Sequence, residues 1–321
     1  MALLSVKNLS IGYQTARGNF RAVDNVSFDL HQGRPLGLVG ESGCGKTTIG
    51  MALMGLLPEN GRITSGEIQF QDRNLAACSP GEWNSVRGRD IAMIFQAAMN
   101  ALNPVFRVDD QVREAIVAHF PDMPPKELEA RVAELFDIVK IPRSRMRDYP
   151  HQYSGGMKQR VIIAMALACN PKVVVADEPT TALDVIVQDQ ILTELRSIQA
   201  KTHTGLVFIS HDMAVVSSLC EDICVMYAGQ IVEAGTREEV FCKPVHPYTR
   251  TLLGSYLSLD NQHEIRAPRM GDGPDLFSEN KSCRFITNCP AAATVCQEHS
   301  PQWVQLSPTH RVLCCKIQGG I

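Results

Sequence analysis

The first 240 residues alternate between short apolar runs and longer stretches in which apolar residues recur every three or four positions. Short apolar runs closed by glycine or polar residues predict buried strands of a parallel sheet, and the longer periodic stretches predict helices. The predicted strands span residues 4–6, 23–30, 36–39, 66–70, 90–95, 172–176, 206–210 and 223–227. The predicted helices span residues 47–57, 108–139 with a break at Pro124 and Pro125, 157–169 and 186–200. This alternation indicates a doubly wound α/β core with a helical insert at about 97–160.

The pattern changes after residue 240. Pro, Gly, Asn and Cys accumulate there, and the periodicity fades after residue 257. We therefore expect a main domain over residues 1–240 and a small appended domain over 241–321 with little core of its own.

Composition narrows the class of protein. The chain has 321 residues, 45% hydrophobic and 20% charged, with a net charge of −3. These values are typical of a globular protein, and they argue against a disordered chain or a dedicated nucleic-acid binder. The apolar runs fall short of the about 18 residues that span a bilayer, and the first residues do not resemble a signal peptide, so we expect a cytosolic protein.

Residues 40–47 fit the phosphate-loop pattern G-x-x-x-x-G-K-[ST] between a predicted buried strand and a predicted helix. In this pattern backbone N–H groups close around phosphate oxygens, Lys46 reaches the β- and γ-phosphates, and Thr47 binds Mg²⁺. Cys44, beside Lys46 and near a helix N-terminus, is expected to favour its thiolate form. The alternative is a glycine-rich turn without a ligand. The predicted nucleotide-binding residues are Gly40, Ser42, Gly43, Cys44, Gly45, Lys46, Thr47 and Thr48.

Two carboxylates follow the apolar run at residues 173–176. Ligand sites of α/β proteins lie at the carboxyl ends of such strands. We expect Asp177 to hold Mg²⁺ through water and Glu178 to act as the general base on the attacking water. The alternative is an acidic turn that faces solvent.

Ser154, Gly155 and Gly156 open another predicted helix. A serine and two glycines at this position form a second phosphate-binding helix terminus, here without a lysine of its own. Since one nucleotide does not need two such sites, this terminus is expected to serve a nucleotide held by another subunit.

In this order the motifs resemble those of the nucleotide-binding subunits of ABC transporters, which have a P-loop (RecA-like) core with a helical subdomain. The resemblance covers about residues 1–240 and includes Gln96 after Ile94-Phe95, and His211 in the sequence ISHD. It implies a Mg²⁺-dependent ATPase, with Tyr13 stacked on adenine and with Phe20 as a competing aromatic residue. It further implies that Gln96 contacts Mg²⁺ and relays to a membrane subunit, that His211 contacts the γ-phosphate, and that Asp184 communicates across a dimer.

The sequence His246-Pro247-Tyr248-Thr249 is similar to the motif that opens the C-terminal extension of oligopeptide, dipeptide and nickel importers. This resemblance implies an ATPase subunit that powers uptake of peptides or nickel complexes at the cytoplasmic face of the membrane. The implied partners are a paralogous ATPase, two transmembrane permease subunits and an extracytoplasmic substrate-binding protein. Alternatives are a soluble ABC ATPase that acts on nucleic acid or ribosomes, and a subunit with an inactive site.

Five of the 11 cysteines lie between Cys283 and Cys315. The array Cys283, Cys289, Cys296 and Cys314 resembles the iron–sulfur ligands of that importer branch, with Cys315 standing where a histidine is common. The long spacing favours a [4Fe–4S] cluster over zinc, whose structural sites contain shorter C-x₂₋₄-C pairs, although zinc or unligated cysteines stay possible interpretations. We expect the extension to be remote from the phosphate loop. The scattered Cys78, Cys169, Cys220, Cys224 and Cys242 are expected to be small buried hydrophobic residues.

Overall fold

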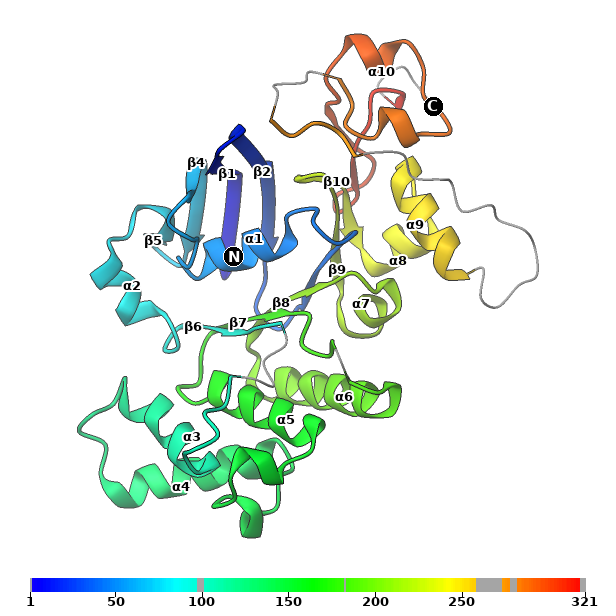
Figure 1. The fold of residues 1–321 in the computed structure, drawn as a ribbon. Coiled ribbons are helices and arrows are strands. Elements are labelled where there is room, and N and C mark those ends of the chain that lie inside the picture. Colours follow the sequence, from blue (N-terminus) through cyan, green and yellow to red (C-terminus); the bar gives the residue numbers. More distant parts are fainter. Residues whose placement is uncertain (1, 97–100, 182, 258–272, 278–281, 318–321) are drawn as a thin grey trace. The chain divides into compact units, whose positions relative to one another are not determined.

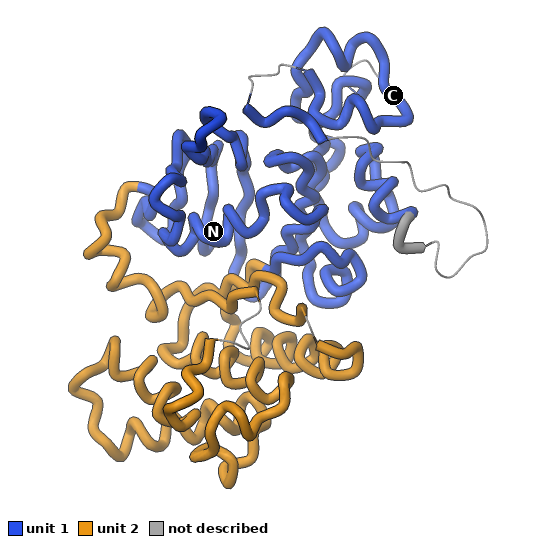
Figure 2. The backbone as a smooth tube through the Cα atoms, viewed as in Figure 1, with its two compact units in different colours: residues 1–76, 208–321 blue, residues 77–207 orange. Residues whose placement is uncertain are grey.

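The computed structural model describes residues 2–96, 101–181, 183–257, 273–277 and 282–317. The chain forms two compact units (Figure 2). Unit 1 contains residues 1–76 and 208–321, and unit 2 contains residues 77–207. Four residues of the predicted helical insert, 97–100, lie outside the described part.

An antiparallel sheet forms the N-terminal part of unit 1 (Figure 1). Its strands, in spatial order, are β2 (Gly18–Leu30), β1 (Leu4–Thr15), β4 (Gly61–Phe70) and β5 (Arg73–Asn74). Apolar side chains of β1 and β2, such as Leu4, Val6 and Val26, are buried, and helix α1 (Lys46–Leu53) also belongs to this unit. Register places Tyr13 of β1 opposite Phe20 of β2.

The second group of strands in unit 1 is built around β3. Buried on all four residues, β3 (Leu36–Val39) pairs in parallel with β9 (Asp222–Tyr227), and β9 pairs antiparallel with β10 (Gln230–Thr236). The group continues with β12 (Arg311–Leu313), which pairs with β10, and ends with β11 (Trp303–Gln305). The helices of this part are α7 (Met213–Leu219), α8 (Arg237–Cys242), α9 (Pro247–Leu257), the 3-10 turn η5 (Ile286–Asn288) and α10 (Val295–Glu298).

Unit 2 combines two parallel strands with a helical cluster. Strand β6 (Ile91–Ile94) pairs with β7 (Val173–Asp177), and both are fully buried. Its helices are α2 (Pro80–Val86), α3 (Val108–Val117), α4 (Pro125–Ile138), α5 (Gly155–Ala166) and α6 (Val185–Thr202), with 3-10 turns at Arg143–Arg145 and Pro150–Gln152. A further 3-10 turn, Leu75–Ala77, contains the boundary between the units. Buried Val112, Val132 and Phe136 form the core of the helical cluster. Strand β8 (Gly205–Ser210) contains the boundary between the units.

The predicted α/β class is confirmed, as are the strand at residues 36–39 and the break at Pro124 and Pro125, where α4 begins after α3 has ended at Val117. Strands β11 and β12 were not predicted, because three residues are too few for a period-two pattern to stand out. The expectation of five buried scattered cysteines holds for Cys220 and Cys224 but is wrong for Cys242, which is exposed. None of the described helices is both long enough and apolar enough to cross a membrane.

Candidate nucleotide site and cysteine-lined cavity

The predicted phosphate loop links the buried strand β3 to helix α1. Gly45, the N-cap of α1, has φ 106°, and a Cβ there would lie 2.6 Å from the Ala22 carbonyl oxygen. A Cβ at Gly40 would lie 2.2 Å from the Met226 carbonyl oxygen. Neither position accepts a side chain, so the close packing of this loop requires glycine there.

The Lys46 side chain folds over the phosphate loop. Its ammonium donates hydrogen bonds of 2.7 Å to the carbonyl oxygens of both Gly40 and Glu41, and it lies 3.6 Å from the Cys44 sulfur. Lys46 is only 5% exposed. A cation is therefore concentrated at the loop, where phosphate oxygens would replace the carbonyl oxygens as acceptors.

Cys44 is a buried thiol, and the expectation that it favours its thiolate is wrong. Burial is the largest influence and raises the pKa of Cys44, while neighbouring Lys46 lowers it by less. Desolvation disfavours the charged form of any acid, and here it outweighs one nearby cation. The thiol is a packed side chain of the loop.

Tyr13 and His211 also lie in unit 1. The Tyr13 hydroxyl lies 3.2 Å from the Thr48 hydroxyl on α1, which brings two predicted nucleotide-binding residues together. Phe20, the competing aromatic residue, packs against Phe277 with ring centroids 5.3 Å apart. His211 is exposed and precedes Asp212, whose carboxylate caps α7.

In unit 2 the two predicted carboxylates stand at the end of β7. Asp177 is buried, and Glu178 is half-buried with φ 45°, a left-handed conformation that is uncommon outside glycine and clusters at functional sites. Glu178 Oε2 accepts hydrogen bonds from Gln96 Nε2 at 3.0 Å and from Thr181 Oγ1 at 2.9 Å. The structure therefore brings Gln96 and Glu178 together, and it adds Thr181, which sequence reasoning missed.

Ser154 and Asp184 begin two helices of unit 2. Ser154 Oγ accepts a hydrogen bond from the Met157 N–H, so that Gly155 and Gly156 form the open first turn of α5. Asp184 Oδ1 accepts from the Val187 N–H and caps α6. Both residues therefore cap helices in this structure. Their roles in nucleotide binding stay predictions.

The five C-terminal cysteines line one cavity of about 200 Å³ in unit 1. His246, Pro247 and Phe285 form part of its wall, and two cations, Arg250 and Lys316, also line it. Burial, with smaller contributions from neighbouring cysteines, raises the pKa of Cys283 and of Cys315 to about 11. These thiols influence one another because the fold gathers them, although the first and the last are 32 positions apart in the sequence.

Within the described residues, no group of three or more His, Cys, Asp or Glu side chains is arranged to hold a metal ion. The cavity nevertheless combines cysteine thiols with two positively charged side chains. Cys315 differs from the others because its sulfur donates to the His299 carbonyl oxygen at 3.4 Å.

The expectation that the extension is remote from the phosphate loop is wrong. The hydroxyl of Tyr248, on α9, accepts a hydrogen bond from the Glu41 N–H at 3.1 Å. The sequence motif at residues 246–249 was the available signal, but it marked the start of the extension and gave no indication of what Tyr248 contacts.

Comparisons with known proteins agree with the motif reading. Residues 23–181 match the family "ABC transporter", and residues 232–296 match "Oligopeptide/dipeptide transporter, C-terminal region". The chain is 44% identical to the dipeptide transport ATP-binding protein DppD of Bacillus subtilis, over 97% of this chain and 94% of that protein. It is 43% identical to the oligopeptide transport ATP-binding protein OppD of Escherichia coli, over 98% and 93%. A similar solved structure is an ATP-binding cassette, a dimer in a post-hydrolysis state bound to ADP and Pi, with TM-score 0.65, 26% identity, and coverage of 73% of this chain and 98% of that one.

Proposed function

Because this chain belongs to the ABC transporter family of ATP-binding proteins, we propose that it is the ATP-hydrolysing subunit of an importer of dipeptides or oligopeptides. The observation that carries the proposal is full-length similarity to peptide-transport ATP-binding proteins, joined to a phosphate loop that is packed as the motif requires. Those relatives are transport proteins, which disfavours an ATPase that acts on nucleic acid or ribosomes. Division into a nucleotide-binding domain at 1–240 and an extension at 241–321 stays our prediction.

The proposed roles are those that the motifs and the family resemblance imply for each residue. Lys46 holds the β- and γ-phosphates, Tyr13 packs against adenine, and His211 contacts the γ-phosphate. Thr47, Asp177 through water, and Gln96 are proposed for Mg²⁺ because the motifs and the resemblance imply these roles and oxygen ligands suit this ion, which would neutralise phosphate charge.

Glu178 is the proposed general base. Its carboxylate would take a proton from the water that attacks the γ-phosphorus, while Gln96 and Thr181 hold Oε2 through the hydrogen bonds already present.

The proposed active form is a dimer with a paralogous ATPase, in which the α5 terminus at Ser154, Gly155 and Gly156 faces the nucleotide of the other subunit. Val185 and Ile186, next to Asp184, are 81% and 73% exposed. Two adjacent apolar side chains in solvent are unfavourable in a monomer, and a dimer interface there would bury them.

Contact with the permease subunits is proposed for the segment after Gln96. Val105 and Phe106 are exposed apolar residues of this segment. We propose that they dock on the cytoplasmic side of two transmembrane permease subunits, which receive cargo from an extracytoplasmic substrate-binding protein.

Uptake by a strain that lacks this chain tests the cargo. Loss of uptake of a labelled dipeptide or oligopeptide, restored by the wild-type chain and not by Lys46→Ala, is the expected result. Loss of nickel uptake with peptide uptake intact would overturn the peptide assignment.

For the cysteine-lined cavity we propose a [4Fe–4S] cluster held by Cys283, Cys289, Cys296 and Cys314. The support is chemical, since a set of thiols gathers in one cavity with Arg250 and Lys316 to offset thiolate charge. Cys314 is proposed as the fourth ligand because the Cys315 thiol already donates to the His299 carbonyl oxygen. The cluster would tie together a region poor in regular apolar pattern, which is a structural role.

Matched serine variants test this ligand set. Protein purified without oxygen should absorb broadly near about 400 nm and carry about four irons per chain. Cys314→Ser should lose the iron and Cys315→Ser should keep it. Colourless protein with stoichiometric zinc, or with no metal, would overturn the cluster, and the reverse behaviour of the two variants would overturn the choice of ligand.

A further inference from the structure

The Glu41 peptide unit of the phosphate loop is held by two side chains. Its N–H donates to the Tyr248 hydroxyl at 3.1 Å, and its carbonyl oxygen accepts from Lys46 at 2.7 Å. Tyr248 is fully buried, and burial raises the pKa of its phenol, so the group stays a neutral hydroxyl. A residue of the extension therefore takes part in fixing the same loop segment as the phosphate-binding lysine.

Aromatic packing fixes the Tyr248 ring. Its centroid lies 4.7 Å from the ring of Tyr227 and 5.4 Å from that of Phe285. Phe285 is buried and also forms part of the wall of the cysteine-lined cavity. A change in the cavity wall would thus reach the Tyr248 ring by direct contact.

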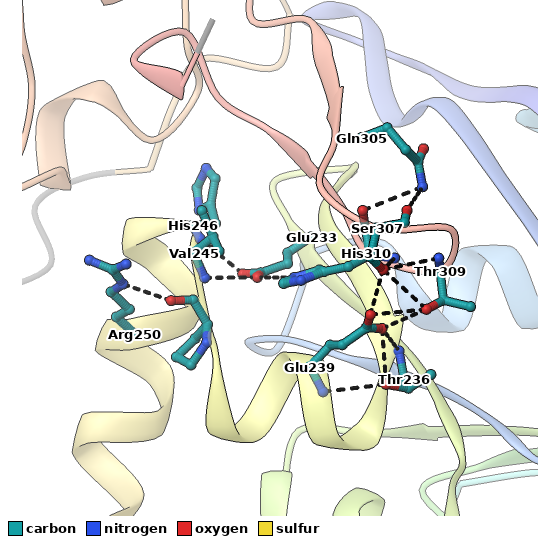
Figure 3. A network of polar contacts seen from close by, with 11 residues as sticks. Glu233, Thr236, Glu239, Val245, His246, Arg250, Gln305, Ser307, Thr309 and His310 are labelled. Carbon is teal, nitrogen blue, oxygen red and sulfur yellow. Dashed lines mark hydrogen bonds and ion pairs between the residues drawn. The ribbon is translucent and has the colours of Figure 1, made fainter. Parts of the chain in front are cut away.

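The backbone before Tyr248 is anchored by a buried carboxylate. Glu233 of β10 accepts from the N–H groups of Val245 and His246 at 2.8 and 3.0 Å, and lies 2.8 Å from His310 Nε2 (Figure 3). His246 Nδ1 in turn accepts from the Tyr248 N–H at 3.1 Å. Residues from β10 and from the loop between β11 and β12 therefore place the start of α9.

A second contact reaches the other end of the loop. Arg284, next to Cys283, donates to the Ala228 carbonyl oxygen and pairs with Asp24. The neighbouring Gly229 N–H donates to the Cys44 carbonyl oxygen at 2.9 Å. The extension thus supports the phosphate loop on both sides, directly at Glu41 and through the β9–β10 turn at Cys44.

We propose that Tyr248 is a positioning residue for the phosphate loop, and that through it the packing of the cysteine-lined cavity sets the affinity for ATP. Without the Tyr248 hydroxyl, the Glu41 N–H loses its hydrogen-bond acceptor. The phosphate loop then samples conformations that bind phosphate less well. The proposal needs the cavity wall to be packed and does not depend on which metal, if any, the cavity holds.

Tyr248→Phe tests the hydrogen bond, and Tyr227→Phe is its matched control. Both changes remove one hydroxyl from the same aromatic cluster, but the Tyr227 hydroxyl accepts from Asn288 Nδ2 at 3.3 Å. In the assembled transporter we expect Tyr248→Phe to raise KM for ATP about fivefold with kcat within twofold, which is the size of one lost hydrogen bond. Amide hydrogen exchange of residues 40–44 should quicken in this variant and not in the control. Equal effects of the two variants, or none from Tyr248→Phe, would overturn the proposal.

Phe285→Leu tests transmission from the cavity. It should raise KM for ATP in the wild-type background. It should have little further effect in Tyr248→Phe, because that variant already lacks the hydrogen bond to Glu41. Phe285→Met has a flexible, unbranched side chain that adapts to the space left by the ring, so its effect should be similar or smaller. It replaces the leucine variant if that variant is unstable. Additive effects in the double variants would overturn transmission through Tyr248, and iron analysis of each variant distinguishes this result from failure of the cluster proposal.

Discussion

The phosphate loop and the cysteine-lined cavity lie in the same unit and are built in opposite ways. The loop consists of consecutive residues between β3 and α1, and its shape follows from glycines that no other residue could replace. The cavity collects side chains from residues 245 to 317, and no short segment of the chain contains its wall. A site made of backbone groups can thus be encoded locally, whereas a site made of side chains from several segments depends on tertiary packing.

The two regions also differ in charge. Lys46 concentrates positive charge at the loop, and burial raises the pKa of the Cys283 and Cys315 thiols in the cavity. The loop therefore favours an anion, while the cavity thiols stay protonated unless a cation, such as the proposed metal centre, stabilises their thiolates. Changes in either region should have separable effects, apart from the connections through Tyr248 and through Arg284.

The largest effect is expected from Glu178→Gln, which removes the proposed base and leaves both regions of unit 1 intact. ATP hydrolysis by the assembled transporter should fall about 10²–10⁴-fold, because an amide does not take a proton from water. ATP binding should persist, and size-exclusion chromatography should show a larger, ATP-held species. Near-normal turnover would remove Glu178 from this role.

Lys46→Ala should affect binding itself. Loss of charge-assisted hydrogen bonds to phosphate is expected to weaken ATP binding by about 10–100-fold. Equilibrium binding of a fluorescent ATP analogue measures this, with Glu178→Gln as the variant that still binds. Iron content should match the wild type, and a loss of iron would show that the regions are less separable than we infer.

Cys289→Ser should lose iron and largely keep ATP binding, which is the opposite of the result expected for Lys46→Ala. The iron content should fall from about four per chain to near zero, and the segment from 273 to 317 should become more sensitive to protease. ATP affinity should change by only a few-fold, since every group of the loop is retained. A variant that keeps its iron would exclude Cys289 as a ligand.

Acid should destabilise the cavity wall through His246. Burial lowers the pKa of His246 to about 4 from its ordinary 6.5. Between these values the unfolded chain binds a proton that the folded chain does not, so the free energy of unfolding falls as pH falls, by up to about 1.4 kcal/mol per pH unit. His246→Asn retains an acceptor for the Tyr248 N–H but does not titrate. Thermal unfolding at pH 7.5 and pH 5 should show a smaller acid loss in this variant, and equal losses would contradict the assignment.

The smallest effect concerns Cys44, whose thiol is buried within the loop. Exposed Cys242 offers an internal control. A maleimide should modify Cys242 first, with ATPase activity unchanged, and Cys44 only slowly, because a protonated buried thiol is a poor nucleophile. Rapid inactivation that Cys44→Ser prevents would show that the thiol is reactive.

Sequence alone was sufficient for features whose cause is local. The strand at 36–39, the glycine-dependent loop at 40–47 and the carboxylates after 173–176 were predictable because each consists of neighbouring residues whose types dictate their conformation. The same reasoning predicted the place of Glu178 but not Thr181 as its hydrogen-bond partner, since two side chains three residues apart meet only in one particular turn.

Tertiary structure decided what depends on burial and on distant contacts. The thiol of Cys44 illustrates burial, because its neighbours in sequence favour the thiolate while the packed fold raises the pKa. The contact between Tyr248 and Glu41 joins residues 207 positions apart, and β12 reaches β10 from 75 or more positions away. Local sequence determines which conformations a segment prefers, but the solvent exposure of a side chain and its distant partners exist only after the chain has folded, and these set the charge state of Cys44 and the support of the phosphate loop.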